Sequence, residues 1–170
     1  LQRADWRELD ARVWGFLEDL YQKGDVRAIG VSNFLPHHLM SLSAHSSLQP
    51  MVNQLEYHPG YTQEAAVAYC QANGIQVEGW SPLGRRRVLN DPLLQEIAAG
   101  HGATASQVCL AFALQSGVVP LPKSSSRQRM EENLAAQSLT LTQEELSRIR
   151  TMPQTGWSGE HPDREQAAPQ

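Results

Sequence analysis

The sequence predicts an α/β protein built around a parallel sheet, and two observations support this prediction. Short apolar runs bounded by Gly, Pro or Asn alternate with segments whose apolar residues recur every three or four positions. The first pattern is typical of buried strands and the second of amphipathic helices, so the chain consists of successive strand–helix units. Polar and aromatic side chains also follow each expected strand, at the end where α/β proteins build their sites.

Four strands are expected, and each is short enough to cross a small sheet once. They are Val26–Val31, Met51–Leu55, Ile75–Gly79 and Val118–Leu121. A closed parallel barrel needs eight strands and takes about 250 residues, so this chain is expected to form a parallel (β/α) half-barrel. A small open sheet with two exposed edges is the alternative.

The expected helices begin at residues whose side chains can cap a helix, namely Asp5, Thr62, Asp91, Thr104 and Thr142. Thr104 and Thr142 are each followed three residues later by Gln or Glu, which is the spacing of a capping box. Pro92 follows Asp91 at the first helical position, where proline is favoured. A further helix is expected to start at the hydroxyl run Ser124–Ser126.

The composition is that of a globular protein, with 41% hydrophobic and 19% charged residues. The net charge of −4 provides no basic field, so neither nucleic acid nor a membrane surface is expected as a partner. No apolar run approaches the roughly 20 residues that cross a bilayer, and the N-terminus lacks a signal-peptide pattern. Two cysteines, Cys70 and Cys109, are too few for a disulfide framework, so we expect buried thiols and a cytoplasmic location.

The polar residues at the strand ends suit one kind of ligand. The side-chain amides of Asn33 and Gln54 can both donate and accept hydrogen bonds, as a carboxamide requires, and Trp80 offers a flat face for a heteroaromatic ring. Lys123 and Arg129 flank a hydroxyl run at an expected helix start, which favours a phosphate. The alternative interpretation is that these clusters are ordinary turn residues.

Four motifs in this order carry a resemblance to a known family. They are Val26–Phe34, Asn53–Pro59, Trp80–Gly84 and the segment from Leu121 to Asn133. The chain resembles the C-terminal half of an aldo-keto reductase, and its tail is similar to that of bacterial diketogluconate reductases. The resemblance implies strands 5–8, with their outer helices, of an eight-stranded TIM barrel.

The resemblance also implies a role for each matched residue in binding NADP(H). Ser32, Asn33 and Gln54 would hold the nicotinamide carboxamide. Trp80 would stack on the nicotinamide ring, and Ser81 and Leu83 would line the pyrophosphate. Residues after the last strand would bind the 2′-phosphate, which distinguishes NADPH from NADH, and the adenine beside it. Those residues are Lys123, Ser124 and Arg129 for the phosphate, and Glu132 and Asn133 for the adenine.

The sequence departs from the family pattern in two places. Many bacterial members carry glycine in the loop where this chain has Arg85–Arg87, a triplet that is otherwise typical of a solvated surface. The family's catalytic Asp, Tyr, Lys and His lie on earlier strands, so no catalytic residue is expected in this chain.

The histidines offer no metal-ligand spacing, so no metal site is expected. His58 belongs to a strand-end motif and is expected to be structural. Four more are expected on loops or at the surface, namely His37, His38, His45 and His101.

The first functional interpretation is part of an NADPH-dependent enzyme that reduces aldehydes or ketones to alcohols by hydride transfer. Residues 1–152 would form the cofactor-binding half of the barrel, inactive alone, and residues 153–170 a C-terminal loop. The expected partners are a small carbonyl substrate and the missing N-terminal half. The alternatives are a non-catalytic dinucleotide-binding protein of the same fold and a truncated product without independent activity.

Overall fold

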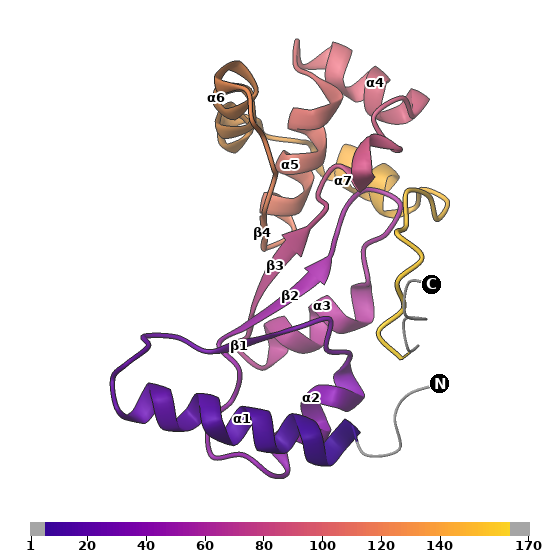
Figure 1. Cartoon of the computed structure of the whole chain (residues 1–170). Coiled ribbons are helices and arrows are strands. Elements are labelled where there is room, and N and C mark those ends of the chain that lie inside the picture. The colour runs from indigo at the N-terminus through magenta and orange to yellow at the C-terminus, as the bar shows by residue number, and fades with distance from the viewer. Residues whose placement is uncertain (1–5, 164–170) are drawn as a thin grey trace, which may run out of the picture. The chain divides into compact units, whose positions relative to one another are not determined.

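The computed structural model describes residues 6–163, in which helices and short strands alternate (Figure 1). The strands are β1 (Gly30–Ser32), β2 (Val52–Glu56), β3 (Gln76–Trp80) and β4 (Val118–Pro120). The helices are α1 (Trp6–Gln22), α2 (Pro36–Ser43), α3 (Glu64–Ala72), α4 (Pro92–Gly100), α5 (Ala105–Gln115), α6 (Arg127–Ala135) and α7 (Gln143–Arg150). Two 3-10 turns, η1 (Gly84–Arg86) and η2 (Ala136–Ser138), complete the series.

The four strands form one sheet in chain order, β1-β2-β3-β4. Strands β1 and β2 pair in parallel with Ser32 opposite Gln54, and β3 and β4 pair in parallel with Gly79 opposite Pro120. Helices connect the strands because parallel neighbours need a crossover. The expected four-stranded parallel α/β sheet is therefore confirmed.

The chain divides into two compact units, and β2 runs from the first into the second. The first unit contains α1, β1, α2, α3 and residues 159–163. One cluster of its core is formed by Trp14, Ile29 and Leu42, which are all buried. The indole nitrogen of Trp14 also donates to the carbonyl oxygen of Leu48 at 3.0 Å, which fixes α1 to the loop before β2.

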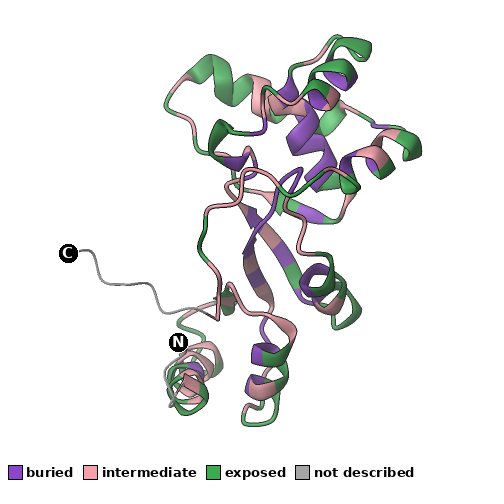
Figure 2. Ribbon diagram, turned by 90° about the vertical axis from the view of Figure 1, so that its right-hand side faces the viewer, coloured by how far each residue is buried: buried purple, intermediate pink, exposed green. Residues whose placement is uncertain are grey.

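The second unit is built around α5, which is buried along most of its length (Figure 2). The ring of Phe112 on α5 stacks on Tyr57 with 5.8 Å between centroids. Both cysteines lie in the cores as expected, Cys70 on α3 in the first unit and Cys109 on α5 in the second. Burial raises the pKa of Cys109 to about 12, so its thiol stays protonated.

Three of the expected helix caps are confirmed. The Asp91 carboxylate accepts from the amide of Leu93 at 2.9 Å, and Thr104 and Thr142 form capping boxes with Gln107 and Glu145. The expected cap at Asp5 lies outside the described residues.

Some element boundaries differ from the prediction. The strand expected over Val26–Val31 is confined to Gly30–Ser32, because β1 lies at the end of the sheet order and pairs on one side only. The helix expected after Thr62 begins at Glu64, since Gln63 has a positive φ of 46° that no helix allows.

Helix α2 is absent from the sequence prediction, and His37 and His38 lie within it instead of in a loop. His38 is only 5% exposed, so its expected surface position is wrong. The N-cap residue is Leu35, whose side chain cannot accept a hydrogen bond. The imidazole Nδ1 of His38, three residues into the chain from Leu35, accepts from the Leu35 backbone amide at 3.0 Å, which is the part that Glu or Gln usually plays in a capping box.

Among residues 6–163, no single helix has the length and apolar composition to cross a membrane; α4 and α5 reach that threshold only taken together, bent by 88°.

Replacing Gly30 by alanine should destabilise the first unit. A Cβ at this position would lie 2.7 Å from the carbonyl oxygen of Val52, so β1 and β2 would have to separate. We expect a loss of about 1–3 kcal/mol in the free energy of unfolding, measured by urea denaturation. Gly15→Ala is the matched control, because a Cβ there meets nothing within 4 Å and alanine favours the helix by about 0.5–1 kcal/mol. Equal stability of the two variants would contradict the close approach at Gly30.

Candidate functional site

The turn after β1 carries the first group of predicted site residues. The Ser32 hydroxyl donates to the backbone carbonyl oxygen of Gln54 at 3.2 Å, and the backbone N–H of Asn33 donates to the same oxygen at 2.9 Å. Asn33 adopts a φ of 58°, a left-handed conformation that is uncommon for a residue with a side chain. The structure therefore brings Ser32, Asn33 and Gln54 together at one end of the β1–β2 pair.

Asn53, which the prediction did not assign to the site, positions this turn. Its side chain is fully buried, and its amide nitrogen donates to the carbonyl oxygen of Phe34 at 2.8 Å while its amide oxygen accepts from the Phe34 nitrogen at 3.3 Å. The same nitrogen lies 3.4 Å from the sulfur of Cys70. A buried amide held in this way fixes the backbone after β1. The only sequence signal was its place in a strand-end motif.

A second turn of the same kind follows β3. Trp80 ends the strand, and Ser81 has a φ of 49°. The carbonyl oxygen of Ser81 then accepts from the amide of Gly84 at 2.8 Å, which starts the 3-10 turn η1. Two predicted site residues thus flank the point where the chain leaves the sheet, and non-glycine residues in this conformation cluster at functional sites.

A polar cavity of about 390 Å³ lies in the second unit, between η1 and the start of α6. Six predicted site residues line it, namely Leu83, Lys123, Ser124, Arg129, Glu132 and Asn133. The lining also includes Arg86, Leu89, Ser106 and Ser125, which the prediction did not assign to the site. Trp80 and Ser81 are not among the lining residues.

Hydrogen bonds fix the wall of this cavity at the start of α6. The Ser126 hydroxyl accepts from the amide of Arg129 at 3.5 Å and caps the helix, and the Ser124 hydroxyl accepts from the Ser126 amide at 3.2 Å. Gln107 on α5 donates to the carbonyl oxygen of Glu132 at 3.1 Å. The cavity therefore has a fixed backbone with three cationic side chains, one carboxylate, hydroxyls and two leucines, which suits a phosphate joined to an apolar ring.

The Arg85–Arg87 triplet divides into different roles. Arg86 lines the cavity, whereas the Arg87 guanidinium donates to the carbonyl oxygen of Trp157 in the C-terminal tail at 3.0 Å. The prediction that the triplet is simply a solvated surface feature is therefore incomplete. Because the three residues are identical, the sequence does not show which arginine lines the cavity and which contacts the tail.

The tail that Arg87 contacts is anchored on a buried carboxylate. Glu56 is 1% exposed, and its oxygens accept from the Ser158 amide at 3.0 Å and from the Ser158 hydroxyl at 2.6 Å. His58 is fully buried, with Nδ1 2.8 Å from the carbonyl oxygen of Pro59 and Nε2 3.4 Å from Glu56. Burial alone raises the pKa of Glu56, but the hydrogen bonds from His58 and Ser158 outweigh it and hold that pKa below its ordinary value.

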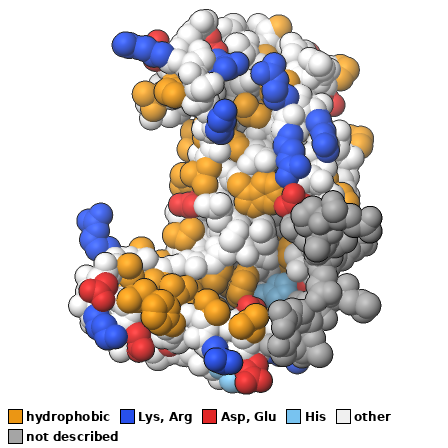
Figure 3. Space-filling model, in the orientation of Figure 1, with side chains coloured by type: hydrophobic (Ala, Val, Ile, Leu, Met, Phe, Trp, Pro, Cys, Tyr) orange, Lys and Arg blue, Asp and Glu red, His pale blue; other side chains and the backbone are white. Residues whose placement is uncertain are grey.

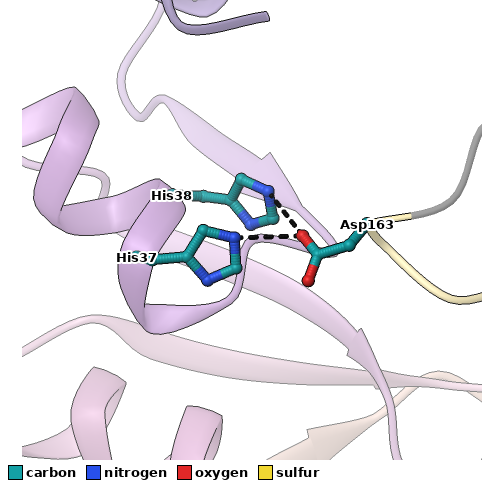
Figure 4. A group of neighbouring side chains, drawn as sticks. All are labelled: His37, His38 and Asp163. Atoms are coloured by element: carbon teal, nitrogen blue, oxygen red, sulfur yellow. Dashed lines mark hydrogen bonds and ion pairs between the residues drawn. The ribbon is translucent and has the colours of Figure 1, made fainter. Parts of the chain in front are cut away.

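A cluster of His37, His38 and Asp163 lies in the first unit (Figure 4). The Nε2 atoms of the two histidines lie 3.0 and 3.1 Å from the same Asp163 oxygen. Because Nδ1 of His38 accepts from the Leu35 amide, the proton of its ring is on Nε2, whose lone pair a metal ion would need. Desolvation and His37 together lower the pKa of His38, against the effect of Asp163, so the ring stays neutral. Hydrogen bonding satisfies these groups, and the expectation of no metal site stays a prediction.

The fold and the cavity together define an α/β protein with a polar pocket that is lined by three cationic side chains and one carboxylate. The model of the aldo/keto reductase family matches residues 4–153, and the chain belongs to this family. The resemblance in the sequence is thereby confirmed.

Characterised relatives agree with this assignment. Glyoxal reductase of Bacillus subtilis is 43% identical over 151 residues, which cover 89% of this chain and 55% of that protein. 2,5-Diketo-D-gluconic acid reductase B of Corynebacterium is 40% identical over 138 residues, which cover 81% of this chain and 50% of that protein. The apo crystal structure of Gox0644 superposes with a TM-score of 0.87 at 34% identity, over 92% of this chain and 58% of that one. The chain thus spans about half the length of the curated relatives it matches.

The Glu56 anchor should make stability depend on pH in the acid range. As the pH falls through about 4.3, the carboxyl group of the unfolded chain takes up a proton while native Glu56 stays ionised, so the free energy of unfolding decreases. Glu56→Gln should cost about 1–3 kcal/mol at pH 7, and the difference from the wild type should shrink below pH 4, measured by urea denaturation.

Glu96→Gln is the control, because Glu96 pairs with Arg148 at the surface and should have a much smaller effect at both pH values. A Glu56→Gln variant whose loss of stability is as large below pH 4 as at pH 7 would contradict the anchor.

Proposed function

We propose that this chain is the NADPH-binding half of an aldo-keto reductase that reduces aldehydes or ketones to alcohols. The observation that carries this proposal is the cavity of about 390 Å³, where six residues assigned to the cofactor from sequence lie together. When bound, NADPH supplies the hydride that reduces the carbonyl carbon.

In this proposal the second unit binds the adenosine end of the cofactor. Lys123, Ser124 and Arg129 hold the 2′-phosphate, because two cations and a hydroxyl offer charge-assisted hydrogen bonds at a capped helix start. Glu132 and Asn133 contact the adenine. Leu83 and Ser81 line the pyrophosphate, and the indole of Trp80 stacks on the nicotinamide ring.

The carboxamide of the nicotinamide is assigned to the residues after β1 and to their neighbour on β2. Asn33 and Gln54 supply amides that both donate and accept, and Ser32 supplies a hydroxyl. The buried Asn53 holds the turn in place through Phe34, so these groups do not need to be ordered when the ligand binds. No proton donor for the alcohol oxygen is proposed in this chain.

We further propose that residues 1–152 form strands 5–8 and the outer helices of a barrel whose other half carries the catalytic Asp, Tyr, Lys and His. Residues 153–170 are the C-terminal loop. An apolar cavity of about 290 Å³ lies beside β1, in a region where α1 exposes Leu9, Val13 and Phe16 (Figure 3). Another of about 340 Å³ lies beside β4. Apolar surface next to both terminal strands supports the proposal, since the missing half would cover it.

The substrate proposed is a small carbonyl compound. The names of the Bacillus and Corynebacterium relatives specify glyoxal and a diketo acid, both of them small molecules with reactive carbonyl groups.

Arg129→Ala should weaken NADPH binding about 10- to 100-fold, because a charge-assisted hydrogen bond contributes about 1.5–3 kcal/mol and 1.4 kcal/mol is roughly tenfold in affinity. NADH lacks the 2′-phosphate, so its affinity should stay nearly unchanged. Fluorescence titration of the purified chain with both cofactors measures the two dissociation constants.

Arg127→Ala is the matched control on the same helix, because Arg127 pairs with Glu131 and does not line the cavity. Equal losses for NADPH and NADH, or the same loss in the control, would overturn the assignment of Arg129.

The chain alone should self-associate through its apolar surfaces. Leu134, which is 66% exposed, lines the cavity beside β4, and Leu134→Glu should weaken association about tenfold by placing a charge in the contact. Analytical ultracentrifugation over a concentration series gives the association constant, and the exposed Ser138→Glu is the control. A monomeric wild-type chain with a cooperative melt at high temperature would contradict the half-barrel.

A further inference from the structure

The η1 turn holds two consecutive residues in a conformation that glycine favours. Arg85 has a φ of 51° and Arg86 a φ of 69°, so both lie in the left-handed region. A side chain at such a φ brings Cβ close to the backbone carbonyl, and glycine avoids this strain. The chain therefore carries arginine where backbone conformation alone would select glycine.

Surrounding contacts fix the turn in this strained form. The Arg86 amide donates to the carbonyl oxygen of Leu83 at 2.8 Å, and the Arg87 amide donates to that of Gly84 at 3.0 Å. The Arg87 side chain is held by the tail at Trp157. Strained residues persist only where neighbouring structure determines them in this way, and they concentrate at ligand sites.

The two strained arginines differ in where they lie. Arg86 lines the polar cavity together with Lys123 and Arg129, whereas Arg85 is not among its lining residues. Glu132 is the one acidic residue in that lining, so the three cations outnumber it. A planar guanidinium can contact a phosphate through two parallel hydrogen bonds, which glycine at this position could not do.

We propose that Arg86 is a phosphate-binding residue of this cavity and that its backbone strain is retained for that contact. The inference rests on the proposed function, and it adds a cation from the turn after β3 to those that follow β4. The phosphate is either the 2′-phosphate or the diphosphate of the cofactor, and the experiment distinguishes the two.

Arg86→Gly and Arg85→Gly form a matched pair for the test, because each removes one arginine and relieves the strain of one left-handed residue. Both variants should melt at or a few degrees above the wild-type temperature. Only Arg86→Gly should weaken NADPH binding, by about tenfold, in a fluorescence titration of the purified chain. A loss confined to NADPH assigns Arg86 to the 2′-phosphate, and an equal loss for NADH assigns it to the diphosphate.

Arg86→Lys keeps the charge without the planar fork and should bind NADPH with an affinity between those of the wild type and Arg86→Gly. If Arg86→Gly and Arg85→Gly bind NADPH equally, or if Arg86→Gly binds as tightly as the wild type, the inference about Arg86 is wrong. A wild-type chain that binds neither cofactor would instead overturn the proposed function. Comparing the wild type with the variants thus separates the two failures.

Discussion

The buried carboxylate of Glu56 is the contact on which the site in the second unit depends. A charge with 1% exposure is tolerable only when hydrogen bonds replace the lost water, and Ser158 and His58 supply them. Because Ser158 is fixed there, the preceding Trp157 offers its carbonyl oxygen to Arg87. Arg87 in turn closes the turn that presents Arg86 to the cavity. The need to hydrogen-bond the buried Glu56 carboxylate thus helps to determine where the exposed Arg86 lies.

The turns after β1 and β3 solve the same geometric problem in both units. Each strand is followed at once by a non-glycine residue with positive φ, Asn33 after Ser32 and Ser81 after Trp80. The positive φ turns the chain out of the sheet, so the polar groups at the strand ends do not continue the hydrogen bonding between strands. Small polar side chains tolerate this conformation better than large or branched ones. A polar group at a strand end and the local backbone conformation therefore favour the same residue types.

Local rules explain what could be predicted from the sequence. The caps at Thr104 and Thr142 involve partners three residues away, and strand patterning depends on neighbouring residues, so both are visible in the chain. Helix α2 escaped prediction because its N-cap residue is Leu35, which has no polar side chain, and a histidine, His38, accepts the hydrogen bond from the Leu35 backbone amide. The Glu56–Ser158 contact joins residues 102 positions apart. The cavity residues on α6 were found by motif, but the different roles of Arg86 and Arg87 depend on tertiary contacts that no spacing encodes.

The two cysteines give each unit its own internal reporter. Cys70 lies in the core of the first unit and Cys109 in that of the second, and neither is accessible to solvent. Alkylating reagents attack the thiolate, and burial raises the pKa of both thiols, so labelling of either requires its surroundings to open. The rates at which Cys70 and Cys109 are alkylated therefore measure how often each unit opens. Equal rates would indicate that the two units open together, and unequal rates that each unit opens independently.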